Sequence, residues 1–193
     1  MSRMPVVFVG HGSPMNAIED NAYSRGWREM AKRIPKPKAI VSVSAHWYTR
    51  GTRIMDEENP EAIYDMYGFP KELYEVTYNA PGSPEIAKAV KELISREIQF
   101  DNSWGIDHGT WSVLVHMYPE RDVPVFQVSI DAYAPPAVHY NIGKELKALR
   151  DQGVLILGTG NVVHNLRLVD WHQVSKGFDW AYEFGFYNIL VGK

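Results

Sequence analysis

The sequence contains no cysteine, so disulfide bonds and thiolate metal ligands are both excluded. It also lacks a long apolar run, and its mean hydropathy is −0.29, a composition that excludes a membrane-spanning helix. The residues before the first apolar segment show no signal-peptide pattern, and we therefore expect a cytoplasmic protein. Any metal ligands must be histidine or carboxylate side chains.

An excess of positive charge is missing as well. The sequence has 20 Lys and Arg residues and 23 Asp and Glu residues, which gives a net charge of −3. It contains no basic stretch that could neutralise the phosphates of a nucleic acid. Nucleic acid is therefore not an expected partner. With 45% hydrophobic and 22% charged residues, the composition is that of a globular protein, and 193 residues fit one domain over residues 1–193. Histidine and aromatic residues are plentiful, with 7 His, 6 Trp, 11 Tyr and 7 Phe.

Apolar segments and helical periodicities alternate along the chain. Four short apolar segments predict buried strands, and five segments with apolar residues at helical spacing predict helices. The strands are Val6–Val9, Ala39–Ser44, Val123–Ile130 and Val154–Leu157, and the helices are Asn21–Arg33, Ser83–Ile98, Thr110–Met117, 135–150 and Phe178–Leu190. This alternation predicts an α/β fold with a mostly parallel central sheet and helices on both faces, where ligands bind at the C-terminal edge of the strands.

Two connections are longer or more polar than the rest. Tyr48–Gly82 has little periodicity beyond one expected strand around Thr52–Met55, and loops of this length commonly line a functional site. Phe100–Gly109 is expected as a polar loop. Ser83, followed by a proline and an acidic residue, is expected to be the N-cap of the helix that it opens.

Three histidines follow predicted strands at the edge where ligands bind. His11 and His46 come just after two of the strands, and His164 comes just after the turn that ends a third. Neutral imidazoles from neighbouring strand ends can converge on one metal ion. A structural role for each ring is the alternative, and it is the expected one for His116, His139 and His172, which lie on helices or polar turns.

His108 differs from these three because it lies on a loop before a helix. A histidine at this position is better suited to act as an acid and base than as a metal ligand. Ser13 is an alternative nucleophile, but the turn around it lacks the glycine that a hydrolase elbow needs. The turn at Gly158–Asn161 lacks the third glycine of a dinucleotide site and the lysine of a phosphate loop, so we interpret it as the turn that delivers His164.

Several motifs taken together resemble one family, the class III extradiol ring-cleaving dioxygenases, in the branch of 4,5-DOPA dioxygenase extradiol proteins. The similarity runs from about Pro5 to the end of the chain. It rests on Gly10–Met15, Ser44–Trp47, Asp107–Trp111 and Gly160–Asn165, with Gly68–Pro70 and Ala80–Pro84 in support.

The resemblance implies a divalent metal at the carboxyl edge of the sheet, Fe(II) for catalysis although Zn(II) can occupy the site in purified protein. It assigns His11, His46 and His164 to the metal site and His108 to the neighbourhood of substrate and oxygen. In related enzymes the histidine matching His164 acts as acid and base, so both roles stay open. Family members extend beyond Lys193 and take a further metal-site residue, a His or a Glu, from that segment, and no residue of this sequence matches it. Two alternatives stay open: a longer chain that supplies this ligand, which we expect, and a shortened member whose site is incomplete.

The resemblance thus implies a dioxygenase that opens a catechol-type ring, DOPA-like or other, with O2 and Fe(II). The expected partners are a small aromatic diol and O2, without nucleic acid or membrane; the sequence specifies neither the catechol nor the oligomeric state. Two alternatives remain: a zinc-dependent hydrolase with Asp107 or Glu19 as base, and a degenerate metal-binding protein without activity. A group of aromatic residues is a candidate pocket for a flat ring, with core packing as the alternative for each of them: Trp47, Tyr48, Tyr64, Tyr67, Trp104 and Tyr133.

Overall fold

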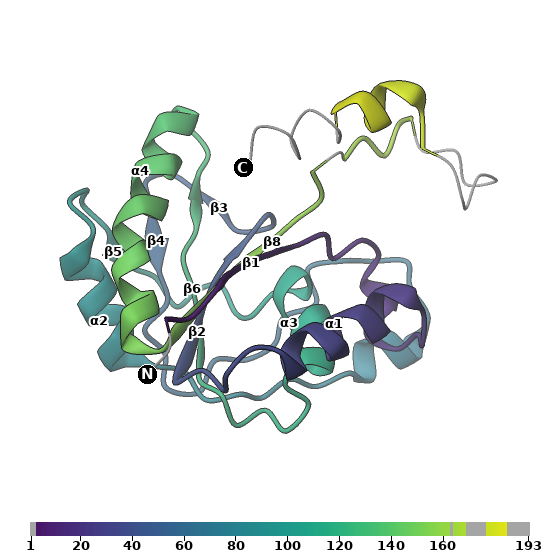
Figure 1. Ribbon diagram of the computed structural model, residues 1–193, viewed down its shortest axis with the longest axis horizontal. Coiled ribbons are helices and arrows are strands. Elements are labelled where there is room, and N and C mark those ends of the chain that lie inside the picture. Colours follow the sequence, from purple (N-terminus) through teal and green to yellow (C-terminus); the bar gives the residue numbers. More distant parts are fainter. Residues whose placement is uncertain (1–2, 163, 169–176, 185–193) are drawn as a thin grey trace. The chain divides into compact units, whose positions relative to one another are not determined.

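The computed structural model describes residues 3–162, 164–168 and 177–184 and divides the chain into two units, residues 1–160 and 161–193 (Figure 1). The first unit is an α/β domain. Its strands are β1 (Val6–Val9), β2 (Ala39–Ser44), β3 (Tyr48–Thr49), β4 (Arg53–Ile54), β5 (Gln99–Phe100), β6 (Val125–Gln127), β7 (Ile130–Asp131) and β8 (Val154–Thr159). Its helices are α1 (Ala22–Lys32), α2 (Pro84–Leu93), α3 (His108–Met117) and α4 (Pro136–Leu146), with short 3-10 helices η1 (Pro14–Ala17), η2 (Lys71–Glu75) and η3 (Lys147–Gln152).

The central sheet has the strand order β1-β8-β2-β6, and all its pairs are parallel. The predicted parallel α/β fold is therefore confirmed. Two small parallel pairs, β3 with β7 and β4 with β5, lie outside this sheet. Thr159, the last residue of β8, pairs with Val9 of β1 on one side and Ser44 of β2 on the other. Three strands thus end at the same level, which fixes the starting points of the loops that follow.

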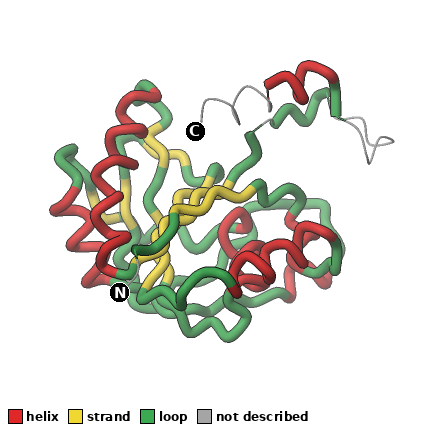
Figure 2. The backbone as a smooth tube through the Cα atoms, in the orientation of Figure 1, coloured by secondary structure: helices red, strands yellow, loops and turns green. Residues whose placement is uncertain are grey.

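Helices cover both faces of this sheet, because alternate residues of each strand point to opposite sides. On one face Ile40 and Leu155 pack in a core with residues of α1 and α3, and on the other Val41 and Ile156 pack with residues of α2 and α4. Figure 2 shows the strands between helices on either side. Within the described residues, no helix is long and apolar enough to cross a membrane.

Local signals explain where some helices begin. Asn21 caps α1, because its side chain accepts hydrogen bonds from the backbone N–H groups of Tyr23 and Ser24. In return, the Ser24 hydroxyl oxygen accepts a hydrogen bond from the backbone N–H of Asn21. The expected cap of α2 is wrong in detail. Ser83 does precede Pro84, but its backbone (φ −141°, ψ 72°) departs from the extended N-cap conformation, and its side chain makes no capping bond.

Several predicted boundaries differ from the structure. α2 ends at Leu93 and not at Ile98, because Ile94 turns to an extended conformation and the chain continues into β5. The strand predicted over 123–130 is two strands, since Val128 still donates to Ser42 of β2 whereas Ile130 donates to Trp47 and pairs with β3. The helix predicted over 135–150 is α4 followed by η3.

The start of α3 is a further correction that bears on the site. The polar loop was expected to reach Gly109, but the helix begins at His108. Asp107 caps it, accepting a hydrogen bond from the Thr110 backbone. In the second unit, residues 179–184 are helical, whereas Phe178, where the predicted helix was to begin, is not, and residues 185–190 of that prediction lie outside the described residues.

Candidate metal centre

Three histidines of the first unit meet at the carboxyl edge of the sheet. His11 follows β1, His46 follows β2, and His108 is the first residue of α3. One ring nitrogen of each lies within 4.8 Å of one ring nitrogen of both others. The ring centroids of His46 and His108 are 4.0 Å apart, and those of His11 and His46 are 4.9 Å apart. His11 and His108 are buried, at 3% and 6% exposed, and His46 is half-buried.

The orientation of the His11 ring is set by Thr159. The Thr159 hydroxyl donates to the Gly109 carbonyl oxygen at 2.6 Å, so it accepts from Nδ1 of His11, 2.8 Å away. This arrangement places the ring proton on Nδ1 and the lone pair on Nε2. Because Thr159 ends the strand between β1 and β2, the sheet register itself supplies the partner that orients His11.

Nε2 of His46 lies 3.0 Å from Nε2 of His11. On the far side of its ring, Nδ1 of His46 faces Oδ2 of Asp65 at 3.8 Å. A carboxylate on that side favours a proton on Nδ1 and leaves the lone pair on Nε2. Two lone pairs directed at each other at this distance repel unless a proton or a cation lies between them. The donor set therefore fits a divalent metal ion, for which neutral imidazole is a common ligand.

Asp65 also holds His108. Its Oδ1 accepts a hydrogen bond from the backbone N–H of His108 at 2.8 Å and lies 2.9 Å from ring Nδ1. The ring contact has the distance but not the angle of a hydrogen bond, so it is an electrostatic contact. Burial disfavours the charged carboxylate of Asp65, but the contacts with the ring and backbone of His108 outweigh burial and lower the pKa of Asp65 below its usual range. Asp65 thus stays ionised beside two of the three histidines.

Asp107 secures the start of α3 against the sheet and is fully buried. One carboxylate oxygen accepts from Ser44 Oγ at 2.7 Å and from the Thr110 backbone, and the other accepts from Trp104 Nε1 and Gln127 Nε2, both at 3.1 Å. Each oxygen is therefore occupied by two donors. This saturation argues against Asp107 as the base of a hydrolase, the role it had in the zinc-hydrolase alternative.

Gly109 allows the start of α3 to lie directly against the end of β2. A Cβ atom at this position would lie 2.8 Å from Ser44 Oγ and 2.9 Å from a ring carbon of His46. No side chain fits in that space, so the glycine after His108 is required for α3 to start directly against the end of β2.

The predicted site residues are only partly brought together. His11 and His46 lie side by side as expected, and His108 joins them from the helix start. His164 belongs to the second unit, so its role as ligand or as acid and base stays a prediction. Two neighbours were missed: Thr159, which was interpreted only as part of a turn, and Asp65, whose one signal was its place in the long Tyr48–Gly82 connection.

The other predicted residues do not belong to the histidine cluster. His116 and His139 bond to backbone carbonyl oxygens away from the cluster, and His172 lies outside the described residues. The six aromatic residues considered for a ring pocket do not share one environment: Trp47 is buried, for example, whereas Tyr67 is 91% exposed.

Together, a parallel α/β sheet and a histidine cluster at its carboxyl edge define a candidate metal-dependent enzyme. A family model described as the catalytic LigB subunit of aromatic ring-opening dioxygenase matches residues 2–182. The chain belongs to this family. The recognition of the extradiol dioxygenase family, and with it the enzyme class expected from the sequence, is confirmed.

Named relatives agree with this membership. The 4,5-DOPA dioxygenase extradiol of Escherichia coli (strain K12) is 50% identical over 188 residues, which cover 96% of this chain and 69% of the relative. The protein of the same name from Beta vulgaris is 41% identical over 165 residues, covering 81% of this chain and 61% of the relative. The crystal structure of an uncharacterized protein from Escherichia coli K12 superposes with a TM-score of 0.82 at 46% identity, covering 96% of this chain and 71% of that one.

Proposed function

We propose that this chain is the catalytic part of a non-haem Fe(II)-dependent extradiol dioxygenase that opens a catechol-type ring with O2. The observation that carries the proposal is the cluster of His11, His46 and His108 at the sheet edge of a chain from this family. The names of its relatives support a DOPA-like catechol as substrate.

In this proposal His11 and His46 hold the metal. Their Nε2 atoms are 3.0 Å apart, and the opposite side of each ring is oriented by Thr159 or Asp65, as is usual for metal-binding histidines. Iron is proposed because a site with few imidazole ligands suits Fe(II) and leaves positions open for substrate and oxygen. When bound, the iron supplies the electronic coupling between catechol and dioxygen. Zn(II) binds such ligands more tightly and is expected in protein purified without added iron.

His108 is the proposed acid and base. Asp65 holds the Nδ1 side of its ring, which leaves Nε2 to accept a proton from a catechol hydroxyl and to return it to the product. A positioned group of this kind contributes roughly 10² to 10⁴ in rate. For His164 two roles are proposed as alternatives, a further metal ligand or a second acid and base.

The test is oxygen consumption after anaerobic loading with Fe(II). We expect uptake of one O2 per catechol ring and a new absorbance band from the ring-opened product, with DOPA and unsubstituted catechol as the first substrates. The His11→Ala variant should lose this activity, and His139→Ala, which removes an imidazole outside the cluster, should keep it. A protein that binds Fe(II) stoichiometrically but consumes no oxygen with any catechol would contradict the proposal and favour a metal-binding protein without activity.

The remaining expectations are also proposals. We propose a cytoplasmic enzyme whose partners are an aromatic diol and O2 and which binds neither nucleic acid nor membrane. Fractionation of the native cell with an antibody to this chain tests the location, and recovery in the membrane fraction would contradict it.

A further inference from the structure

The loop that carries His11 is anchored by a buried asparagine. Asn16 lies in η1, is 7% exposed, and donates from Nδ2 to the backbone carbonyl oxygen of His11 at 2.9 Å. Between them Gly12 has a φ of +63°, and a Cβ atom there would approach Asn16 Nδ2 to 3.0 Å. The chain thus turns tightly over the Asn16 side chain, which fixes the backbone from which His11 projects.

The amide of Asn16 is itself held in one orientation. Its Oδ1 accepts a hydrogen bond from Asn21 Nδ2 at 2.7 Å, so its Nδ2 must face His11. Asn21 is the N-cap of α1 and is fixed by its bonds to the first turn of that helix. The start of α1 therefore determines the direction in which Asn16 donates.

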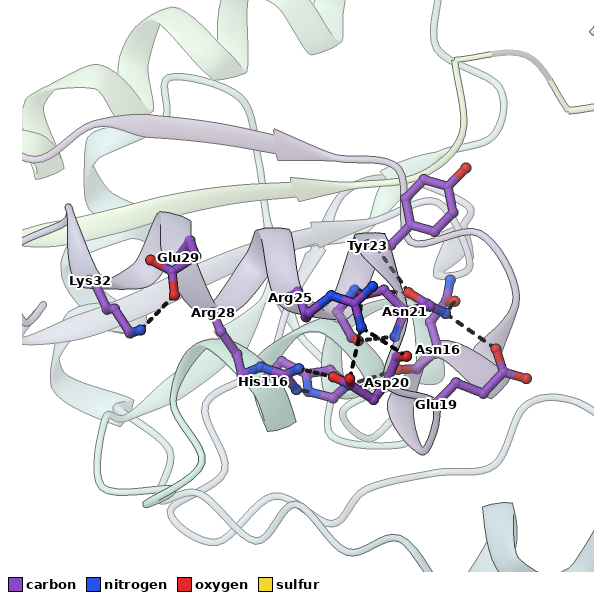
Figure 3. A network of polar contacts seen from close by, with 11 residues as sticks. Asn16, Glu19, Asp20, Asn21, Tyr23, Arg25, Arg28, Glu29, Lys32 and His116 are labelled. Carbon is purple, nitrogen blue, oxygen red and sulfur yellow. Dashed lines mark hydrogen bonds and ion pairs between the residues drawn. The ribbon is translucent and has the colours of Figure 1, made fainter. Parts of the chain in front are cut away.

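His116 of α3 supports Asn16 from the other side (Figure 3). Its Nε2 lies 2.7 Å from the Asn16 carbonyl oxygen, which only accepts, so Nε2 is the donor. Its Nδ1 lies 3.1 Å from a nitrogen of the Arg28 guanidinium, which only donates, so Nδ1 is the acceptor. These two contacts together require a neutral ring protonated at Nε2.

The hydrogen bonds from Asn16 through His116 lead to an ion-pair cluster of Asp20, Arg25 and Arg28 at the surface. Asp20 accepts hydrogen bonds from Arg25, at 2.8 Å, and from Arg28, and these contacts lower the pKa of the Asp20 carboxyl below its usual range. Arg28 is thereby held where it can donate to His116. Figure 3 shows these side chains along one side of α1, with His116 beside Arg28.

We propose that Asn16 is a positioning residue for the metal-binding loop and that His116 acts through it. The inference rests on the proposed metal-binding role of His11. Thr159 orients the His11 ring, whereas Asn16 fixes its backbone, so the two anchors act on different parts of the same residue. Loss of a partner outside the ligand set typically lowers metal affinity 10- to 100-fold, and we expect a loss in this range when the Asn16 anchor is removed.

The first test is Asn16→Leu, which keeps the number and branching of the side-chain heavy atoms but removes the Nδ2 donor and the Oδ1 acceptor. Zn²⁺ affinity is measured by competition with a chromophoric chelator, and amide hydrogen exchange is measured in the metal-free protein over residues 10–16. We expect affinity to fall about 10-fold or more and exchange in this segment to accelerate. The matched control is Asn102→Leu, which removes an asparagine that makes two hydrogen bonds to Asp56. Unchanged affinity and exchange in Asn16→Leu, or equal losses in the control, would overturn the inference.

The second test uses His116 and remains informative if Asn16→Leu does not fold. His116→Gln retains a donor for the Asn16 carbonyl and an acceptor for Arg28, whereas His116→Leu has neither. We expect the leucine variant to bind Zn²⁺ several-fold more weakly, the glutamine variant to recover most of the affinity, and both to leave the metal-to-protein ratio at saturation unchanged. Equal affinities for the two variants would refute the role of His116. A wild-type protein that binds no Zn²⁺ would instead refute the proposed function, and the hydrogen exchange of the loop would still decide the anchoring role.

Discussion

Nε2 of His11 and Nε2 of His46 approach to 3.0 Å although the two residues are 35 positions apart in the chain. The contact joins the ends of two strands that do not pair with each other, since β8 lies between them. Partners on the other side of each ring, Thr159 and Asp65, favour lone pairs on both of these atoms. The contact is the basis for expecting one metal ion bound by both residues.

Replacing either residue should therefore weaken metal binding. We expect His11→Ala and His46→Ala each to lower Zn²⁺ affinity by about an order of magnitude or more, because each change removes a ligand. Competition with a chelator measures the affinity, and elemental analysis measures the stoichiometry. If both variants retain one tightly bound metal ion per chain, this site is not where the metal binds.

His108 is expected to act on protons and not to hold the metal. His108→Gln should retain metal and lower ring cleavage by roughly 10²-fold or more. His164→Ala provides the comparison, since a loss of metal there would favour a ligand and a loss of activity alone would favour an acid and base. Loss of metal from His108→Gln would place His108 among the ligands, an assignment that its 4.0 Å ring separation from His46 would accommodate.

Asp65 is expected to orient His108 through charge. Asp65→Asn keeps the size of the side chain but removes the carboxylate that faces the ring of His108 at 2.9 Å and that of His46 at 3.8 Å. We expect kcat to fall about 10-fold or more with a smaller change in KM, because an orienting partner of the acid and base is lost. Steady-state kinetics with Fe(II)-loaded protein measures both constants, and a variant with wild-type kcat would show that the carboxylate is dispensable.

Tyr118 should make the protein sensitive to alkali. Burial raises the pKa of Tyr118 to about 12, so its folded form binds a proton more tightly than the unfolded form, in which the pKa is about 10. The resulting stabilisation is present below about pH 10 and is lost as the pH rises toward 12. Among the described residues the Tyr118 hydroxyl has no hydrogen-bond partner, so Tyr118→Phe should be as stable as wild type, or more stable, at pH 7.

Urea unfolding at pH 7 and at pH 10.5 measures this effect. We expect the stability difference between the two pH values to be smaller in Tyr118→Phe than in wild type. Replacing an exposed tyrosine, Tyr67→Phe, is the control and should leave the difference unchanged. A loss of stability at pH 7 in Tyr118→Phe would mean that the hydroxyl has a partner.

The elements of the sheet were predictable because their signals are local. Apolar segments and helical spacing identified β1, β2 and β8 to within two residues and gave the parallel α/β class. The insertion of β8 between β1 and β2 is not encoded in any one segment, because the pairing joins residues such as Val9 and Thr159 from opposite ends of the domain. Asp65 was missed for a related reason: it lies in a connection without periodicity, and only tertiary contacts bring its carboxylate to His108.

The position of β8 also determines when the site forms during synthesis. His11 and His46 are made early, but the strand that separates and aligns β1 and β2 is made near residue 159. A growing chain without β8 contains His11 and His46 but lacks the strand pairing that sets the distance between them. It also lacks Thr159, which orients the ring of His11. Contacts between distant segments form slowly because the intervening loop must first close. Metal capture is therefore expected as a late folding event, and a chain that stalls before residue 159 should leave the ribosome without a formed site.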